Sequence, residues 1–112
     1  MNISAIAKRI GMDYDLVLED YCGDVSLISS KLASFVKDCN FKALEDKKAA
    51  GDEDGLKAEA HRIKKLAEKM GITPLLKAAQ LVENAKGNKL GSAYETLESE
   101  YNKVAQVLAE LD

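Results

Sequence analysis

The chain has 112 residues, of which 46% are apolar and 31% charged, and its formal net charge is −3. This length corresponds to one domain that can bury a core of its own. No basic run could neutralise nucleic-acid phosphates, and no apolar stretch approaches the roughly 20 residues that cross a bilayer. The N-terminus lacks the apolar core of a signal peptide. We therefore expect a single cytoplasmic domain over residues 1–112, without nucleic acid or membrane as partner.

Few residues of the chain are of the types that commonly carry chemistry. There are two cysteines, Cys22 and Cys39, and one histidine, His61. In a reducing compartment the thiols stay free, and without nearby histidines they make no zinc site. The sequence has neither a G-x-S-x-G turn nor a glycine-rich phosphate loop. We therefore expect no metal, no cofactor and no ATP-binding site in this chain.

The spacing of apolar residues predicts an all-α fold that begins with two short helices. The first is expected over residues 2–10. The second is expected over residues 14–21, with Asp13 as its cap and with Leu16 and Val17 inward. Both are too short to be stable alone. We expect them to cover a larger helical bundle.

Four longer helices are predicted to follow, over residues 24–50, 52–70, 74–87 and 89–111. Asp24 and Asp52 are candidate caps of the first two, and Thr73 is the candidate cap of the third, with Pro74 at its first helical position. The links between these helices are short. Short links force neighbouring helices to run antiparallel, which predicts an up-down four-helix bundle.

The last predicted helix has the clearest periodicity, with apolar residues alternately four and three positions apart. They are Leu90, Tyr94, Leu97, Tyr101, Val104, Leu108 and Leu111. This is the spacing of helices that cross at about 20°. It also suits a coiled-coil dimer, but the pattern spans few heptads and three other amphipathic helices need a partner. The pattern therefore favours a monomer.

Helical geometry places His61 on the solvent side of the helix predicted over 52–70. At about 100° per residue, the apolar face lies roughly 200° away from His61. Lys57, Lys64, Lys65 and Glu68 surround it instead. Such a histidine is often only part of a solvated surface. The chemical alternative is phosphoryl transfer, because neutral imidazole is nucleophilic near pH 7 and nearby ammonium groups stabilise an attached phosphoryl group.

Residues 52–71, DEDGLKAEAHRIKKLAEKMG, resemble the signature of histidine-containing phosphotransfer (HPt) domains. The matching positions are Ala60, His61, Ile63, Lys64, Ala67 and Gly71. The similarity extends to the turn at residues 21–24, to Phe35, to the turn at 50–52 and to residues 81–83, and so covers nearly the whole chain. Two positions depart from the signature: Lys65 stands where the family has glycine, and Leu66 where it has a small residue.

The resemblance implies a phosphorelay intermediate that does not hydrolyse ATP. His61 would accept a phosphoryl group from an aspartate of one receiver domain and pass it to another, and Mg²⁺ would come from the receiver. Lys64 would stabilise the phosphoryl group, and Glu83 would orient His61 or remain a solvated acid. Lys65, where the family has glycine, is a second candidate to stabilise the phosphoryl group because it lies one turn after His61. The expected partners are response-regulator receiver domains and a hybrid histidine kinase, which would contact Lys57, Glu68, Lys69 and Glu83.

Two other functions stay open at the level of sequence. The chain could be an HPt-like interaction module that binds a receiver or a kinase without carrying phosphate. Lys65 bears on this alternative, because a long side chain there could permit binding and obstruct transfer. The chain could also be a helical adaptor whose short N-terminal helices form a peptide groove.

Overall fold

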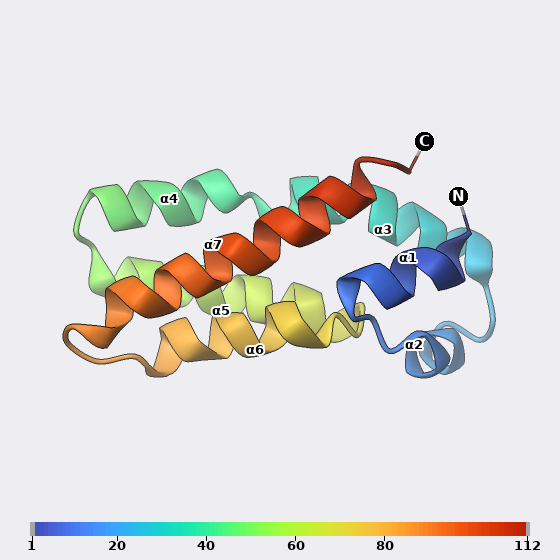
Figure 1. The fold of residues 1–112 in the computed structure, drawn as a ribbon, viewed down its shortest axis with the longest axis horizontal. Helices are drawn as coiled ribbons and strands as arrows, with labels where there is room; N and C mark the ends of the chain where they lie inside the picture. Colours follow the sequence, from blue (N-terminus) through green and yellow to red (C-terminus); the bar gives the residue numbers. More distant parts are fainter. Residues whose placement is uncertain (1, 112) are drawn as a thin grey trace.

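The computed structural model describes residues 2–111, and within them it is all-helical, as the sequence predicts (Figure 1). The helices are α1 (Ile3–Ile10), α2 (Tyr14–Asp20), α3 (Val25–Cys39), α4 (Phe41–Ala49), α5 (Glu53–Lys69), α6 (Thr73–Asn84) and α7 (Lys89–Leu108).

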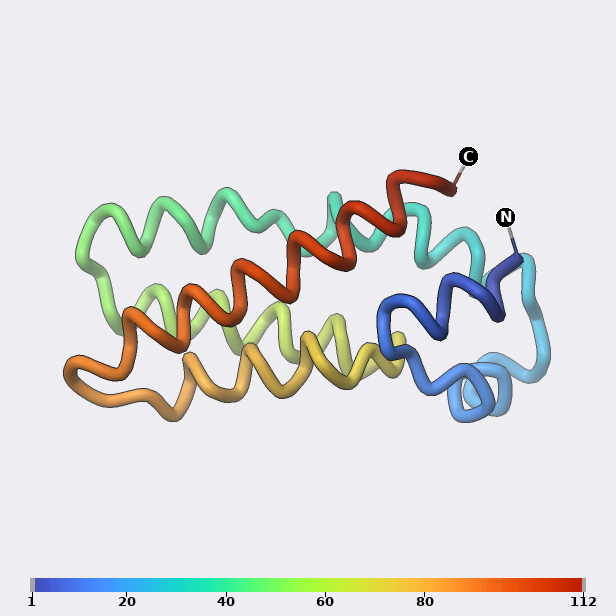
Figure 2. The backbone as a smooth tube through the Cα atoms, in the orientation of Figure 1, coloured from blue at the N-terminus to red at the C-terminus, as the bar shows by residue number. Residues whose placement is uncertain are grey.

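The longer helices lie side by side along the long axis of a body measuring 42 × 23 × 18 Å. α5 packs along α6 and against α4, and α6 packs against α7. The tube in Figure 2 shows α1, α2 and the first part of α3 at one end, and the described part of the chain both begins and ends toward that side. Arg9 of α1 pairs with Glu110 over 2.8 Å, which ties the N-terminal helix to the end of the chain.

The core is apolar throughout the described residues. Its largest fully buried side chains include Ile6, Ile28, Leu32, Leu44, Leu56, Ile63, Ile72, Leu75 and Leu97. Ile72 lies in the link before α6, and the others come from every helix except α2, whose buried residue is Val17. The expectation that Leu16 also points inward is wrong, since 48% of it is exposed. Leu16 lies about 100° around the helix from Val17, and so it faces outward.

The single long helix predicted over residues 24–50 is also wrong, because the chain breaks at Asn40. This residue has φ 42° and ψ 61°, in the left-handed region, and α4 begins directly after it. In an unbroken helix Phe41 and Leu44 would lie roughly 200° and 140° from Cys39, away from the core. The break rotates both side chains inward, where Phe41 is 7% and Leu44 0% exposed. Asparagine tolerates the left-handed conformation better than most residues.

The predicted caps are confirmed at three helices and wrong at one. Asp13, Asp24 and Asp52 each accept a hydrogen bond from the backbone N–H three residues later. At α6 the cap position is Ile72, and the hydroxyl of Thr73 donates to the carbonyl of Gly71 instead of capping. α6 ends at Asn84 and α7 at Leu108, each three residues before the predicted end.

The link between α1 and α2 packs on the start of α6. Gly11 ends α1 with φ 70°, and a Cβ at this position would come within 2.6 Å of the Pro74 ring. The carbonyl of Gly11 accepts from the N–H of Thr73 over 3.3 Å, and Met12 forms a β-bridge with Ile72. The two short helices are therefore fixed to one end of the longer ones.

Candidate functional site

His61 lies in the middle of α5 and points away from the core. Half of its side chain is exposed, whereas Ala60 and Ile63 beside it are fully buried. The outward orientation predicted from helical periodicity is therefore confirmed.

Glu83 on α6 holds one nitrogen of the His61 ring. Nδ1 of His61 lies 2.8 Å from Oε2 of Glu83. A carboxylate can only accept a hydrogen bond, so the contact assigns a proton to Nδ1. In the neutral ring the lone pair is then on Nε2, which is the nucleophilic nitrogen.

The same carboxylate pairs with Lys64. Lys64 Nζ lies 3.2 Å from Oε1 of Glu83, and about a fifth of each side chain is exposed. Oε1 is itself buried, and the contact has the length of an ion pair but not the angles of a hydrogen bond. Burial alone would raise the pKa of Glu83, but the contacts with His61 and Lys64 outweigh burial and lower it. Glu83 is therefore ionised at neutral pH.

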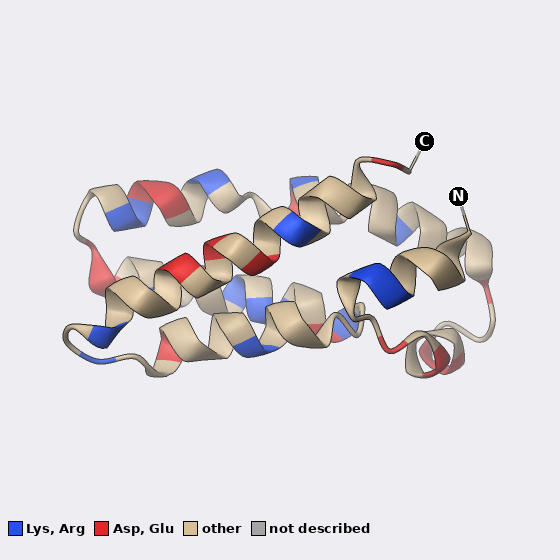
Figure 3. Cartoon of the chain, viewed as in Figure 1, with Lys and Arg blue, Asp and Glu red and all other residues tan. Residues whose placement is uncertain are grey.

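The other charged residues expected around His61 fall into two groups. Lys57 pairs with Glu53 over 3.5 Å. Lys65, Glu68 and Lys69 are exposed, and none of the three has an ion-pair partner within 4.0 Å in the part of the chain that the structure describes. Figure 3 shows basic residues along α5 and acidic residues on α2 and the middle of α7. Lys65, one turn after His61, is thus a cation near the ring that is not engaged by a carboxylate.

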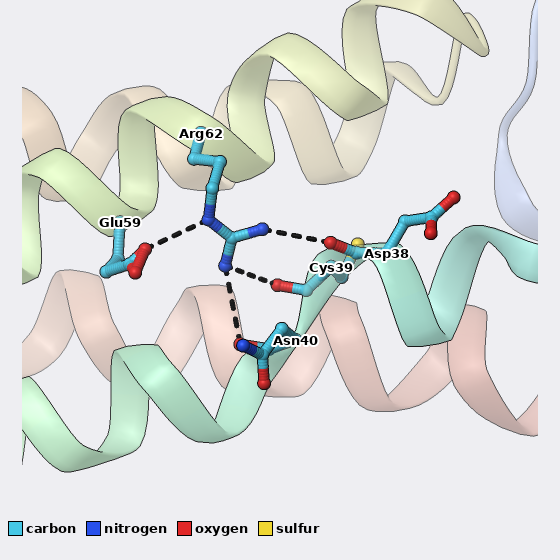
Figure 4. A network of polar contacts seen from close by, with 5 residues as sticks. All are labelled: Asp38, Cys39, Asn40, Glu59 and Arg62. Carbon is cyan, nitrogen blue, oxygen red and sulfur yellow. Dashed lines mark hydrogen bonds and ion pairs between the residues drawn. The ribbon is translucent and has the colours of Figure 1, made fainter.

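Arg62, which sequence reasoning did not single out, ties α5 to the end of α3 (Figure 4). Its guanidinium donates to the carbonyls of Asp38 over 2.9 Å, Cys39 over 2.6 Å and Asn40 over 3.3 Å. Its Nε donates to Glu59 over 2.9 Å. The carbonyls of Asp38 and Cys39 lack helical partners because α3 stops there, whereas that of Asn40 also accepts from the N–H of Ala43 over 3.1 Å. The apolar periodicity held no signal for this contact, since it exists only once the chain breaks at Asn40.

Arg62 and Glu83 act on opposite sides of α5. Arg62 joins α5 to α3, and Glu83 joins it to α6 through His61 and Lys64. His61 is consequently presented by a helix that is held from both sides. The ring is anchored at Nδ1 and open at Nε2, which suits transfer of a group to or from another protein.

The cysteine thiols take no part in this site. Cys39 is fully buried, and burial raises the pKa of its thiol to about 12, so the reactive thiolate is absent at neutral pH. Cys22 is exposed and free. Among the described residues, no three His, Cys, Asp or Glu side chains are grouped so that they could hold a metal ion. Within residues 2–111, no helix has both the length and the apolar character needed to span a bilayer.

Comparison with protein-family models, curated proteins and solved structures found no match for this chain. A function must therefore be argued from the surroundings of His61 and from the sequence motif that contains it.

Proposed function

We propose that the protein is a phosphorelay intermediate of the HPt type, in which His61 accepts a phosphoryl group from one receiver domain and donates it to another. The observation that carries the proposal is the exposed imidazole whose Nδ1 is held by Glu83, 2.8 Å away. The HPt-like motif around His61 supports it independently.

The chemistry follows from the tautomer that Glu83 selects. The lone pair of Nε2 attacks the phosphorus of an aspartyl phosphate on the receiver. The phosphorus–oxygen bond breaks, and its electron pair leaves with the aspartate carboxylate. Nε2 carries no proton in this tautomer, so none has to be removed, and the positive charge that develops on the ring is stabilised by Glu83. In the onward step the ring leaves as neutral imidazole with Nδ1 still protonated.

Lys65 and Lys64 stabilise the phosphoryl group in different ways. Lys65 has no carboxylate partner within residues 2–111 and is the cation available to the phosphoryl oxygens from the start. Lys64 is shared with Glu83 and can turn to the phosphoryl group once that group brings its own negative charge. Lys57, Glu68 and Lys69 belong to the surface that the partner covers. Mg²⁺ and the acidic residues that bind it come from the receiver domain.

The arrangement of the helices fits this role. α3 and α4 together act as one broken helix, which makes an antiparallel up-down four-helix bundle with α5, α6 and α7. The bundle works as a cytoplasmic monomer, and its partners are response-regulator receiver domains and a hybrid histidine kinase.

The proposal is tested with a set of receiver domains that have been phosphorylated by acetyl phosphate. Incubation with the protein should give acid-labile, base-stable phosphate on the wild type. His61→Gln, with its fold verified by circular dichroism, should take up none. Label that persists in this variant would reject His61 as the site.

Exposed Lys65 favours one other candidate function, an interaction module that binds receivers without carrying phosphate. Its side chain begins one turn from His61, where it can obstruct a receiver loop. In that case the wild type would bind receivers and remain unphosphorylated.

A further inference from the structure

A small, half-open cavity lies between α3 and α5, near the end of the molecule that α2 covers. Its volume is about 120 Å³. Buried Phe35 and Met70 and half-buried Leu66 make its base apolar. Ligand pockets for whole metabolites measure roughly 300–1,000 Å³, whereas an apolar cavity of about 150 Å³ holds a single benzene molecule. The cavity therefore has room for one apolar side chain.

The rim of the cavity is basic. Lys31 on α3 and Lys69 on α5 are exposed, and neither lies within 4.0 Å of a carboxylate of the described residues. Asp38 is the acidic residue of the rim, and its carboxylate accepts from the Ser34 hydroxyl over 3.1 Å. The hydroxyl of Tyr21 donates only to the sulfur of Met70, 3.5 Å away. On a chain of net charge −3, this local excess of positive charge favours an acidic partner.

The cavity lies within reach of a protein that docks over His61. Leu66 and Lys69 follow His61 on α5 by five and eight residues, which is about 8 and 12 Å along the helix axis and about 140° and 80° around it. A standard interface covers about 800 Å² of each protein, so it extends roughly 16 Å from its centre. One partner can therefore contact His61 and fill the cavity together.

We propose that this cavity receives an apolar side chain, flanked by carboxylates, from the protein that exchanges phosphoryl groups with His61. The inference rests on the proposed function and adds the means by which the partner is chosen. Interfaces draw most of their binding energy from a few anchors seated in pockets. The cavity supplies the anchor site, and Lys31 and Lys69 select the acidic surroundings of the anchor.

The proposal can be tested without a known partner, by NMR titration of the ¹⁵N-labelled protein with three blocked tripeptides. These are acetyl-Glu-Leu-Glu-amide, acetyl-Lys-Leu-Lys-amide and acetyl-Glu-Ala-Glu-amide, at millimolar concentrations. The first should shift the amide signals of residues 31, 35, 66 and 69. The second tests the need for acidic flanks and the third the need for an apolar side chain, and both should bind at least severalfold more weakly.

Matched variants locate the binding. Leu66→Trp fills the cavity and should abolish the shifts caused by acetyl-Glu-Leu-Glu-amide. Leu81→Trp makes the same change at a leucine of α6 that is 52% exposed and does not line the cavity, and it should leave them intact. If Leu66→Trp does not fold, Lys69→Glu provides the same test, since it should weaken the acidic peptide and strengthen the basic one.

The proposal is overturned if acetyl-Glu-Leu-Glu-amide causes no shifts at the cavity, or if either control peptide binds equally well. His61→Gln should bind the acidic leucine peptide like the wild type, because His61 does not line the cavity. If acetyl-Glu-Leu-Glu-amide binds at the cavity but no phosphorylated receiver domain transfers phosphate to His61, the proposed function is refuted and the anchor site remains.

Discussion

Glu83 on α6 accepts a hydrogen bond from Nδ1 of His61 on α5, with 2.8 Å between the two atoms. The other oxygen of the same carboxylate pairs with Lys64. One carboxylate therefore selects the tautomer of His61 and also engages the charge of Lys64. The stability and the chemistry of the site both depend on Glu83 being ionised.

Replacement of Glu83 by glutamine should make stability less dependent on acid pH. The contacts with His61 and Lys64 hold the pKa of Glu83 below its ordinary value of 4.5, despite the opposing effect of burial. A lowered pKa means that the carboxylate stabilises the fold fully above pH 4.5 and loses this effect as pH falls through the folded-state pKa. The wild type should exceed Glu83→Gln by about 1–2 kcal/mol at pH 7, and the difference should shrink below pH 4.5.

Thermal unfolding of both proteins between pH 3 and pH 7 measures this difference. The comparison with Glu83→Gln cancels the acid sensitivity of other carboxylates, such as Asp52 and Glu110, whose pKa values are also lowered. A difference that stays constant down to pH 3 would show that the charge of Glu83 does not stabilise the fold.

Replacement of Lys65 by glycine should retain phosphotransfer and broaden the range of receivers served. The lysine stem can swing aside at a cost of about 0.5–1.5 kcal/mol in rotamer freedom, which is a few-fold to about tenfold in rate. Glycine inside α5 should also lower the free energy of unfolding by about 1 kcal/mol. Competitive transfer to several receivers measures the effect, with Lys65→Ala as a control that keeps the helix propensity. An inert wild type that glycine activates would support the interaction module instead.

Loss of the Arg62 guanidinium should destabilise the whole fold. Arg62→Met leaves the carbonyls of Asp38 and Cys39 without their donor, and charge-assisted hydrogen bonds contribute about 1.5–3 kcal/mol each, though not additively. We expect a loss of roughly 2–3 kcal/mol in the free energy of unfolding by urea. Arg62→Lys should recover only part of it, because one ammonium lacks the planar fork that reaches several carbonyls. A methionine variant as stable as the wild type would show that solvent replaces these bonds.

Asn40 should tolerate glycine and resist alanine. Its φ of 42° lies in the left-handed region, which costs an alanine about 1–2 kcal/mol and glycine almost nothing. Asn40→Ala should therefore lower the free energy of unfolding by about 1 kcal/mol, while Asn40→Gly changes it little. The opposite order, with alanine the more stable, would indicate one unbroken helix over residues 25–49.

Periodicity predicted the elements that depend on local sequence. The inward faces of α5 and α7, the aspartate caps and the outward direction of His61 follow from the turn of about 100° per residue and from hydrogen bonds made within a few residues. The break at Asn40 was missed because Leu44 looks like a continuation of the apolar stripe formed by Ile28, Leu32, Phe35 and Cys39. Leu44 follows Cys39 by five residues instead of three or four, and this was the available signal that the apolar face changes direction there.

The polar contacts of the site needed the tertiary structure. Lys64 could have pointed to solvent beside His61, and only the packing of α6 on α5 brings Glu83 within 3.2 Å of it. Arg62 caps the C-terminal end of α3 only because α3 ends next to it. The contacts that a side chain makes with another helix depend on residues far away in sequence. The periodicity of a single helix does not predict them.

The identity of the atom that carries the phosphoryl group tests the proposed role of His61 most directly. The protein, labelled with ¹⁵N in its single histidine, is incubated with acetyl-phosphate-treated receiver domains and examined by ¹H, ¹⁵N and ³¹P NMR. We expect phosphorus bonded to Nε2 of His61, with a proton on Nδ1. Phosphorus on Nδ1, phosphate on another residue or no transfer from any receiver would contradict the proposed role.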